Sequence, residues 1–387
     1  MHGRTAVAGV GESRYYRRGA ADETEFQLAC IAIRNAVEDA GLKLSDVDGI
    51  VSFMDRDRNH PARLGAALGT GKLNFTGQAW GGGGNLGMST LMIADGALTA
   101  GYAECVVIFR ALAQGQFGRF GRAPAVARAA GEQAYLMPFG VAAPVVRNAL
   151  MVRRYMHEHG IGQEALAEIA LAAYAHAQHN PRAVRYGHPL TREDYHASRW
   201  IAEPFHLFDC CQENDGAAAI VMTTAERARD LAKPPVYLRA AAAGMERWGG
   251  VPAFNEPSFP NGRYWHIGEK LWERAGAGPA DVDVAQFYEN FSGTTLMAIS
   301  DIGFAPADGI EDFVSGGNIQ WPDGDLPINT SGGNLAEAYI HGFQAVNEGV
   351  RQVRGDSTCQ VPDVELSLVV SGPGTPPGSA ALFSREP

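Results

Sequence analysis

The chain alternates short apolar runs with longer amphipathic stretches. Seven of the apolar runs are predicted to form buried strands: residues 5–11, 47–53, 104–111, 217–224, 235–244, 282–291 and 365–372. Helical patterns lie between them, at residues 24–40, 86–100, 266–275 and 334–353. Buried strands that alternate with helices are typical of α/β proteins. The pattern therefore predicts a parallel sheet with helices on its faces.

A glycine-rich turn occurs twice, and each copy precedes a predicted long helix. The sequence GGNL begins at Gly83 and again at Gly332. The pattern AG-x-x-x-x-DVD also recurs, at residues 40–48 and 275–283. In both parts of the chain the order is helix, AG…DVD pattern, strand, glycine turn, long helix and strand. This repeat predicts two βαβαβ halves related by a pseudo-two-fold axis, with both glycine turns able to face one pocket.

The repeat also predicts the domain organisation. Residues 1–233 form the first half and residues 234–387 the second. Residues 111–200 interrupt the first half and look helical and loop-like, so they are expected to be an insertion.

Composition restricts the class of protein. The chain has 387 residues, of which 46% are hydrophobic and 19% charged, as in a globular protein. No stretch reaches the ~18 uninterrupted apolar residues of a membrane span, and the N-terminus lacks a signal-peptide pattern. We therefore expect a soluble cytoplasmic protein. The net charge of −11 argues against a nucleic-acid partner.

The five cysteines predict neither a disulfide framework nor a metal site. Their number is odd, their spacing is irregular and no CxxC pair is present. The adjacent Cys210 and Cys211 are expected to be inert core residues at a strand entrance, and no metal is expected in this chain.

Charge is distributed unevenly. Residues 111–200 contain ten arginines, six acidic residues and no lysine. One interpretation is a solvated basic loop region. The other is an anion site, because the planar guanidinium fork suits the phosphates of a polyphosphorylated substrate handle.

Several segments resemble the sterol-carrier branch of the thiolases. They read FDCCQENDGAAAIVMTT, FYENFSGTTLMAISDIGF and INTSGGNLAEAYIHG, and the similarity extends over nearly the whole chain. This resemblance implies the thiolase fold, an α/β fold of two duplicated halves with buried helices between the sheets.

The chain departs from thiolases at each of their chemical positions. The nucleophilic cysteine falls on Gly84, the second-half histidine on Tyr339, and the histidine or asparagine of the NEAF-like segment on Tyr288. The last strand loop reads SGPGTPPG, where Ser371 is the nearest candidate. A Claisen enzyme needs a thiolate to carry the acyl group, and none is found at that place.

The glycine turn and the EAYIHG sequence resemble the thiolase-like aldolases of steroid side-chain degradation, called lipid-transfer-protein aldolases. The resemblance implies retro-aldol cleavage of a bulky β-hydroxyacyl-CoA, giving a ketone or aldehyde and a shortened acyl-CoA. It also implies a homodimeric core that joins a small zinc-containing OB-fold partner in a heterotetramer. No cofactor is expected in this chain, since coenzyme A is part of the substrate.

Retro-aldol chemistry needs a base for the β-hydroxyl, donors for the enolate and an acid for its carbon. Tyr339 and Tyr288 are the candidate acid and base, although each could instead be a structural tyrosine. His341 is a third candidate, but on a helix it would not face Tyr339, so a supporting role is expected. The candidate substrate-binding residues lie in the glycine turns and one aromatic loop: Gly82, Gly83, Gly84, Asn85, Ser331, Gly332, Gly333 and Tyr264. The amides of the first turn are expected to form an oxyanion site at a helix N-terminus.

Two other functions remain open at this stage. The chain could be a catalytically silent thiolase-like subunit that binds acyl-CoA or organises a partner enzyme. It could also be a Claisen-type enzyme whose nucleophile has moved to another position.

Overall fold

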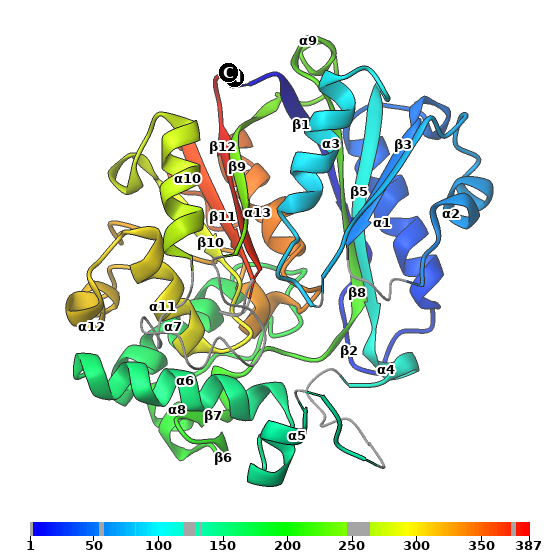
Figure 1. The fold of residues 1–387 in the computed structure, drawn as a ribbon. Coiled ribbons are helices and arrows are strands. Elements are labelled where there is room, and N and C mark those ends of the chain that lie inside the picture. Colours follow the sequence, from blue (N-terminus) through cyan, green and yellow to red (C-terminus); the bar gives the residue numbers. More distant parts are fainter. Residues whose placement is uncertain are drawn as a thin grey trace.

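A computed structural model describes residues 3–53, 58–81, 83–119, 128–131, 133–245, 264–372 and 377–387 (Figure 1). All seven predicted strands are present. They are β1 (Thr5–Glu12), β3 (Gly49–Phe53), β5 (Cys105–Ala113), β8 (Asn214–Thr224), β9 (Val236–Gly244), β10 (Val284–Phe287) and β11 (Leu366–Ser371). Three further strands of the same sheet were not predicted: β2 (Tyr16–Arg17), β4 (Phe75–Ala79) and β12 (Gly378–Ser384).

The strand order repeats between the two parts of the chain. The first part runs β3-β5-β8-β1 and the second β10-β11-β12-β9. In each, the first two strands are parallel and the others antiparallel. The predicted parallel sheet is therefore wrong in detail, because apolar runs identify buried strands without fixing their direction. The repeated order is that of a duplicated fold, whereas the boundary at residues 233/234 stays a prediction.

We call the two parts of the sheet, β3-β5-β8-β1 and β10-β11-β12-β9, the half-sheets. Two helices lie between them (Figure 1). Helices α3 (Ser89–Thr99) and α13 (Gln344–Arg354) each contact strands of both halves. Helix α1 (Glu25–Asp39) covers the outer face of the first half-sheet, and α10 (Trp265–Ala275) covers that of the second. Strands β1 and β9 join the half-sheets through only two residue pairs, Ala6–Tyr237 and Val7–Val236.

Helix α1 illustrates how local sequence sets this packing. Thr24 caps its N-terminus by accepting from the Gln27 amide, and the Gln27 side chain accepts from the Thr24 amide in return. Its buried face meets β1 at very short range, since a Cβ on Gly9 would lie 2.1 Å from the Ala36 carbonyl oxygen. Glycine is required there for the helix to approach the strand.

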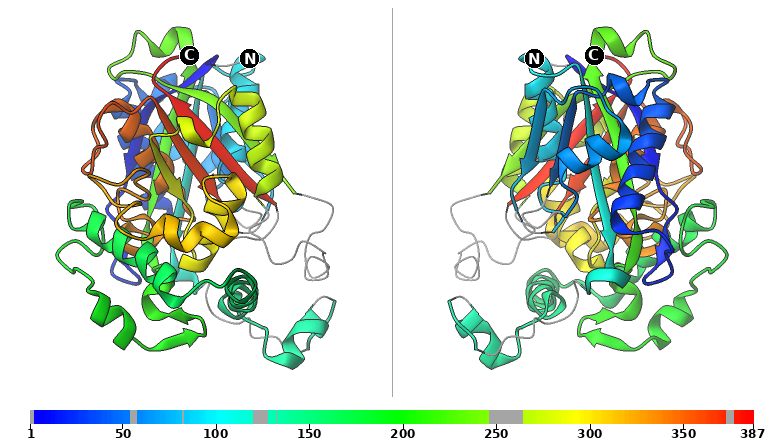
Figure 2. Two further views of the ribbon diagram at one scale, coloured as in Figure 1. Left: turned by 90° about the vertical axis from the view of Figure 1, so that its left-hand side faces the viewer. Right: turned by 90° about the vertical axis from the view of Figure 1, so that its right-hand side faces the viewer.

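The inserted region lies across one end of the sheets, and both chain termini lie at the other end (Figure 2). Its main helices are α6 (Pro144–His159) and α7 (Gln163–Ala177), and its shorter helices are α4 (Gln114–Phe117), α5 (Gln133–Leu136) and α8 (Arg192–Ala197). The short strands β6 (Trp200–Ala202) and β7 (Phe205–His206) come at and just after its end. Over the described ranges, no single helix is long and apolar enough to cross a membrane. One bent pair, Gln133–Phe139 with Pro144–His159, passes the same test only by length and composition.

The predicted long helix over residues 334–353 is wrong. A short π-helical turn, η7 (Gly333–Glu337), is followed by extended and turn residues, and α13 begins only at Gln344. His341 has a φ of 52° and Gly342 one of 72°, both in the left-handed region that interrupts a helix. Tyr339 and His341 therefore lie on a non-helical segment, at the end of the sheets that faces the insertion.

Candidate active site

Tyr288 and Tyr339 form a buried pair. Their hydroxyl oxygens lie 2.8 Å apart, and their side chains are 4% and 8% exposed. Tyr288 follows strand β10 and donates its amide to the Val370 carbonyl on β11. The Tyr339 amide donates to Asn214 Oδ1 at the start of β8. The structure therefore brings the two predicted tyrosines together from segments 51 residues apart.

Both phenols resist ionisation. Burial raises the pKa of Tyr288 well above its usual value, and the neighbouring Tyr339 raises it further. Burial also raises the pKa of Tyr339. Neither tyrosine is therefore a resting phenolate base, and the pair is suited to pass protons along its shared hydrogen bond.

Gly84, at the position of the thiolase cysteine, packs directly against this pair. A Cβ on Gly84 would lie 2.3 Å from the Tyr288 ring and 2.5 Å from the His341 carbonyl oxygen. A Cβ on Gly342 would lie 2.3 Å from the same ring. The Tyr288 ring thus occupies the space that a side chain at position 84 would need. Ser371 donates its hydroxyl to the Gly84 carbonyl, which fixes the turn from the opposite side.

The second glycine turn contacts the residue after Tyr288. A Cβ on Gly333 would lie 2.1 Å from Glu289 Oε1, and the Asn334 amide donates to Glu289 Oε2 at 2.8 Å. The two turns therefore approach the Tyr288–Glu289 dipeptide from the two halves of the fold. Gly332 has a φ of 104° and packs against Ala177.

Two buried carboxyl groups support this second turn. Burial raises the pKa of Glu289 to about 8 and that of Glu337 to about 7. Ser331 donates its hydroxyl to Glu337 Oε2 at 2.6 Å. Ser331, Gly332 and Gly333 are thus engaged within the protein. They are not among the described residues that line the cavity beside Tyr339, which is described below.

His341 faces Tyr339, contrary to the sequence expectation, because the segment is not helical. Their ring centroids lie 5.4 Å apart in an edge-on arrangement. Arg110 Nε donates to His341 Nδ1 at 3.2 Å. A neutral imidazole that accepts at Nδ1 carries its proton on Nε2. Burial, followed by the charge of Arg110, lowers the pKa of His341 well below its usual value, so the ring is a neutral donor and not a base.

The remaining predicted binding residues lie near the first turn. Gly82 is outside the described residues. Gly83 has a φ of 65°, and Asn85 is buried with its carbonyl accepting from Ser379. Helix α3 begins at Ser89, so the turn precedes the helix and its amides are not the helix N-terminus that was expected. Tyr264 is 1% exposed and donates its hydroxyl to the Gly372 carbonyl, where it anchors the last strand loop.

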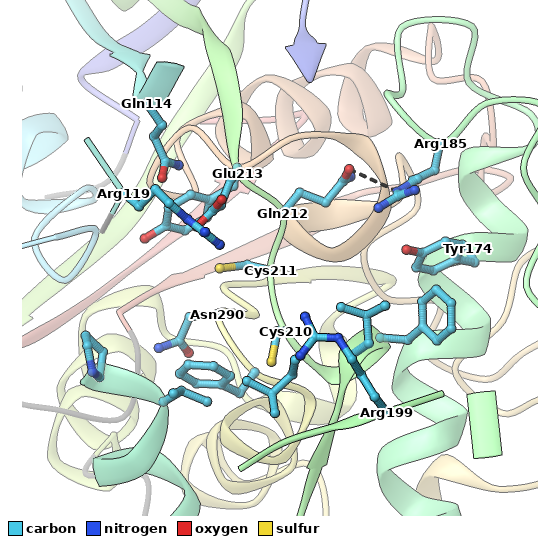
Figure 3. A pocket seen from close by; sticks show the side chains of 17 residues that line it. Gln114, Arg119, Tyr174, Arg185, Arg199, Cys210, Cys211, Gln212, Glu213 and Asn290 are labelled. Carbon is cyan, nitrogen blue, oxygen red and sulfur yellow. Dashed lines mark hydrogen bonds and ion pairs between the residues drawn. The ribbon is translucent and has the colours of Figure 1, made fainter. Parts of the chain in front are cut away.

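A cavity of about 580 Å³ opens beside Tyr339 (Figure 3). One wall is apolar, with Val145, Ile201, Leu207, Phe208 and Phe291. Three arginines of the inserted region also line it, which supports the anion-site interpretation. They are Arg119, Arg185 and Arg199. Arg119 pairs with Glu213 at 2.7 Å, and Arg185 donates to Gln212 at 3.1 Å.

Sequence reasoning missed part of this lining. Cys210 and Cys211 were expected to be core residues, yet both line the cavity, together with Asn290 (Figure 3). Burial raises the pKa of both thiols, so neither has the thiolate character of a thiolase nucleophile. They lie beside the FYEN segment because the backbone of Cys210 pairs with that of Phe291, and this pairing leaves no signal in the sequence.

No group of three or more histidine, cysteine, aspartate or glutamate side chains is arranged to hold a metal ion within the described ranges.

A duplicated α/β fold with two tyrosines, and a glycine in place of the nucleophile, defines a thiolase-like protein built for chemistry other than acyl transfer. Residues 265–382 match the thiolase C-terminal domain-like family. The chain is 38% identical to the 17-hydroxy-3-oxo-4-pregnene-20-carboxyl-CoA lyase of Mycobacterium tuberculosis, over 99% of this chain and 100% of the relative. It is also 38% identical to a steroid side-chain-cleaving aldolase of Thermomonospora curvata, over 99% and 98%. The chain belongs to this family of thiolase-like steroid aldolases.

Solved structures agree. The Ltp2-ChsH2(DUF35) aldolase superposes with a TM-score of 0.90 at 36% identity, over 99% of this chain and 98% of that one. The acetyl-CoA acetyltransferase of Syntrophomonas wolfei superposes with a TM-score of 0.69 at 16% identity, over 100% of both chains, which shows the shared thiolase fold alone.

Proposed function

We propose that this protein is a carbon–carbon lyase that cleaves a bulky β-hydroxyacyl-CoA, with a steroid side chain as the acyl group. The products are a ketone or aldehyde and a shortened acyl-CoA. The observation that carries the proposal is the 2.8 Å hydroxyl pair of Tyr288 and Tyr339 at the former thiolase cysteine site. The function of the 38% identical relatives supports the substrate class.

The tyrosine pair moves one proton. In the retro-aldol step the β-hydroxyl loses its proton, the Cα–Cβ bond breaks, and its electron pair becomes the enolate of the thioester. The enolate carbon then takes up a proton. Because both phenol pKa values are raised, a separate phenolate is unfavourable. We infer that one phenol accepts the hydroxyl proton while it passes its own proton to the other phenol across their hydrogen bond. The second phenol gives its proton to the enolate carbon, so both phenols end neutral.

His341 and the first glycine turn would stabilise the enolate oxygen. His341 supplies a neutral Nε2–H donor, oriented by Arg110. The backbone of Gly84 comes this close to Tyr288 only because it has no side chain. Donors aimed at a developing oxyanion in a buried site are strongly stabilising.

The lining of the cavity suits a large acyl-CoA substrate. Its apolar wall would contact the hydrocarbon rings, and its arginines would contact the phosphates of coenzyme A. The catalytically silent alternative does not explain why two buried tyrosine hydroxyls are paired at this site. The Claisen alternative needs a thiolate, which burial disfavours at Cys210 and Cys211.

We also propose a partner subunit. The solved Ltp2-ChsH2(DUF35) aldolase is a complex by its name, and it covers 99% of this chain. From the resemblance to the lipid-transfer-protein aldolases, we infer that this chain forms a homodimeric core with a small zinc-containing OB-fold protein. The test of the function is incubation with a panel of β-hydroxyacyl-CoAs, with and without such a partner, and detection of the released ketone or aldehyde. A protein that binds these thioesters but releases no carbonyl product in either case would support the silent subunit instead.

A further inference from the structure

A second cavity, of about 770 Å³, lies between the loop after β1 and the loop after α7. It is separate from the active-site cavity, because the two have no lining residue in common. Three arginines and a tyrosine define its character: Arg14, Arg17, Arg182 and Tyr15.

Two polar groups in this cavity are buried without a partner among the described residues. The Tyr15 hydroxyl has no hydrogen bond, although the side chain is only 6% exposed. Arg182 Nε and Nη2 are likewise buried and unbonded. Buried donors without an acceptor are costly and uncommon, so their occurrence together indicates that an acceptor is missing.

The nearby carboxylates do not supply that acceptor. Glu12 is the acidic residue in the cavity lining. Arg351 donates to its Oε2 at 2.7 Å and forms an ion pair with its Oε1 at 2.5 Å, although Oε1 makes no hydrogen bond among the described residues. Glu337 accepts from Ser331 at 2.6 Å and from Asn180 at 3.0 Å. Among the described residues Arg182 forms no ion pair with either carboxyl group, although its positive charge acts against burial to lower the pKa of both.

Further positive charge lies at the open side. Arg14 and Arg17 are exposed and line the same cavity. Arg14 stacks over the Tyr16 ring at 5.0 Å, and Arg17 contacts His188 Nε2 at 3.1 Å. Arginine forks combined with a tyrosine hydroxyl match the oxygen acceptors and the double charge of a phosphate group.

We propose that this cavity binds a phosphate group, with Arg182 and Tyr15 as the buried contacts and Arg14 and Arg17 at the entrance. The cavity is larger than one phosphate, so it accommodates either inorganic phosphate or the phosphate of an organic ester. The shortened acyl-CoA that the proposed reaction releases carries such phosphate esters on its coenzyme A part. The site does not depend on the aldolase chemistry.

The cavity lies behind the segment that carries Tyr339. Tyr15 packs against Ala338 and Ile340, the residues on either side of Tyr339. The Val184 amide, from the cavity wall, donates to the Glu337 carbonyl at 2.8 Å. An occupied cavity would therefore hold residues 336–340 more firmly, which slows exchange of their backbone amides.

Calorimetric titration with inorganic phosphate at low ionic strength tests the site. Wild-type protein is expected to bind one phosphate, and Arg182→Met to abolish that binding. Tyr15→Phe removes only the unpartnered hydroxyl; it is expected to fold normally and to weaken binding about tenfold. Arg63→Gln, an exposed arginine on α2 (Pro61–Leu68), is the control for charge and should bind as wild type.

Coenzyme A in a second titration identifies the source of the phosphate. A CoA-binding event that Arg182→Met removes, alongside one that it leaves, assigns the site to the coenzyme. Phosphate binding without such an event assigns it to free phosphate. Equal phosphate binding by wild type, Arg182→Met and Tyr15→Phe, or no binding at all, overturns the proposal. Hydrogen exchange of residues 336–340 should slow with phosphate only in proteins that bind it.

Discussion

Position 84 has no room for a side chain, because the ring of Tyr288 occupies the space into which a Cβ atom would project. Restoring a side chain therefore does not restore a thiolase, since the nucleophile would overlap the tyrosine at 2.3 Å. Compared with thiolases, the chain thus has glycine at the position of the cysteine and tyrosine at the position of the histidine or asparagine of the NEAF-like segment.

Gly84→Ala is expected to destabilise the protein by roughly 1–3 kcal/mol, as overpacking of a core does. Denaturant unfolding measures the effect. Gly96→Ala is the matched control in α3, because nothing lies within 4 Å of its Cβ position. That control should gain about 0.5–1 kcal/mol of helix stability. Equal unfolding midpoints for the two variants would contradict the close contact with Tyr288.

Arg199 lines the active-site cavity, and we predict that it binds the charged end of the substrate. Arg199→Gln should raise KM for acyl-CoA about tenfold with kcat unchanged, because such a contact is the same in the ground and transition states. The effect should shrink as salt is added. Arg153→Gln, an exposed change on α6, is the control. A fall in kcat with constant KM would place Arg199 in the chemistry instead.

Most of the elements that are defined by burial were predictable, although β12 was missed while every one of its residues is buried. The seven apolar strands and the helix at residues 24–40 follow directly from periodicity. Strand β4 was missed because, as the edge strand, it alternates exposed and partly buried residues over Phe75–Ala79. The break in the predicted helix at residues 334–353 was missed because a left-handed His341 leaves no pattern of its own. That break is what brings His341 toward Tyr339.

The carboxyl group of Glu289, which accepts a hydrogen bond from the η7 turn, should make the stability of the fold depend on pH. Burial raises its pKa in the folded state to about 8, above its ordinary 4.5. Between these values the unfolded carboxyl is ionised while the folded one keeps its proton, so the free energy of unfolding falls as pH rises. The Glu289→Gln variant does not titrate at this position, so its free energy of unfolding should not fall in this way. The difference in free energy of unfolding between this variant and wild type should grow between pH 5 and pH 8 to the order of 2 kcal/mol.

Unfolding by denaturant at pH 5 and pH 8 checks this prediction. Glu273→Gln is the control, because that exposed residue is paired with Lys270, and its pKa is lowered and not raised. It should show no change in relative stability over this range. A constant difference between Glu289→Gln and wild type at the two pH values would contradict a protonated Glu289.

At the scale of the whole molecule, the duplication places the site. Tyr288 and Tyr339 belong to the second half, whereas Gly84 and Arg110 belong to the first, so the site exists only where the halves meet. The sequence repeat predicted this meeting, and the replaced thiolase positions predicted the tyrosines. The arginines of the inserted region suggested an anion site, but the sequence did not indicate which of them line the cavity. Cys211 was not predictable as a lining residue, because it reaches the cavity through pairing with the distant Asn290.

The resemblance to the lipid-transfer-protein aldolases leads us to predict a complex. Expressed with a small zinc-containing OB-fold protein, the chain should elute as an assembly larger than a homodimer and should show higher lyase activity or solubility. Size-exclusion chromatography with a zinc assay of the peak measures this. A lone monomer with full activity would contradict both the dimer and the partner.

We propose that the Tyr288–Tyr339 pair carries out the proton transfer and that no thiolate is needed. Steady-state kinetics of Tyr339→Phe, Tyr288→Phe and Cys211→Ala on a β-hydroxyacyl-CoA test it most directly. Each phenylalanine variant keeps the ring and loses only the hydroxyl. It should therefore lose roughly 100-fold or more in kcat with little change in KM, while Cys211→Ala stays near wild type. Near-normal kcat in both phenylalanine variants, or an inactive but folded Cys211→Ala, would contradict the account.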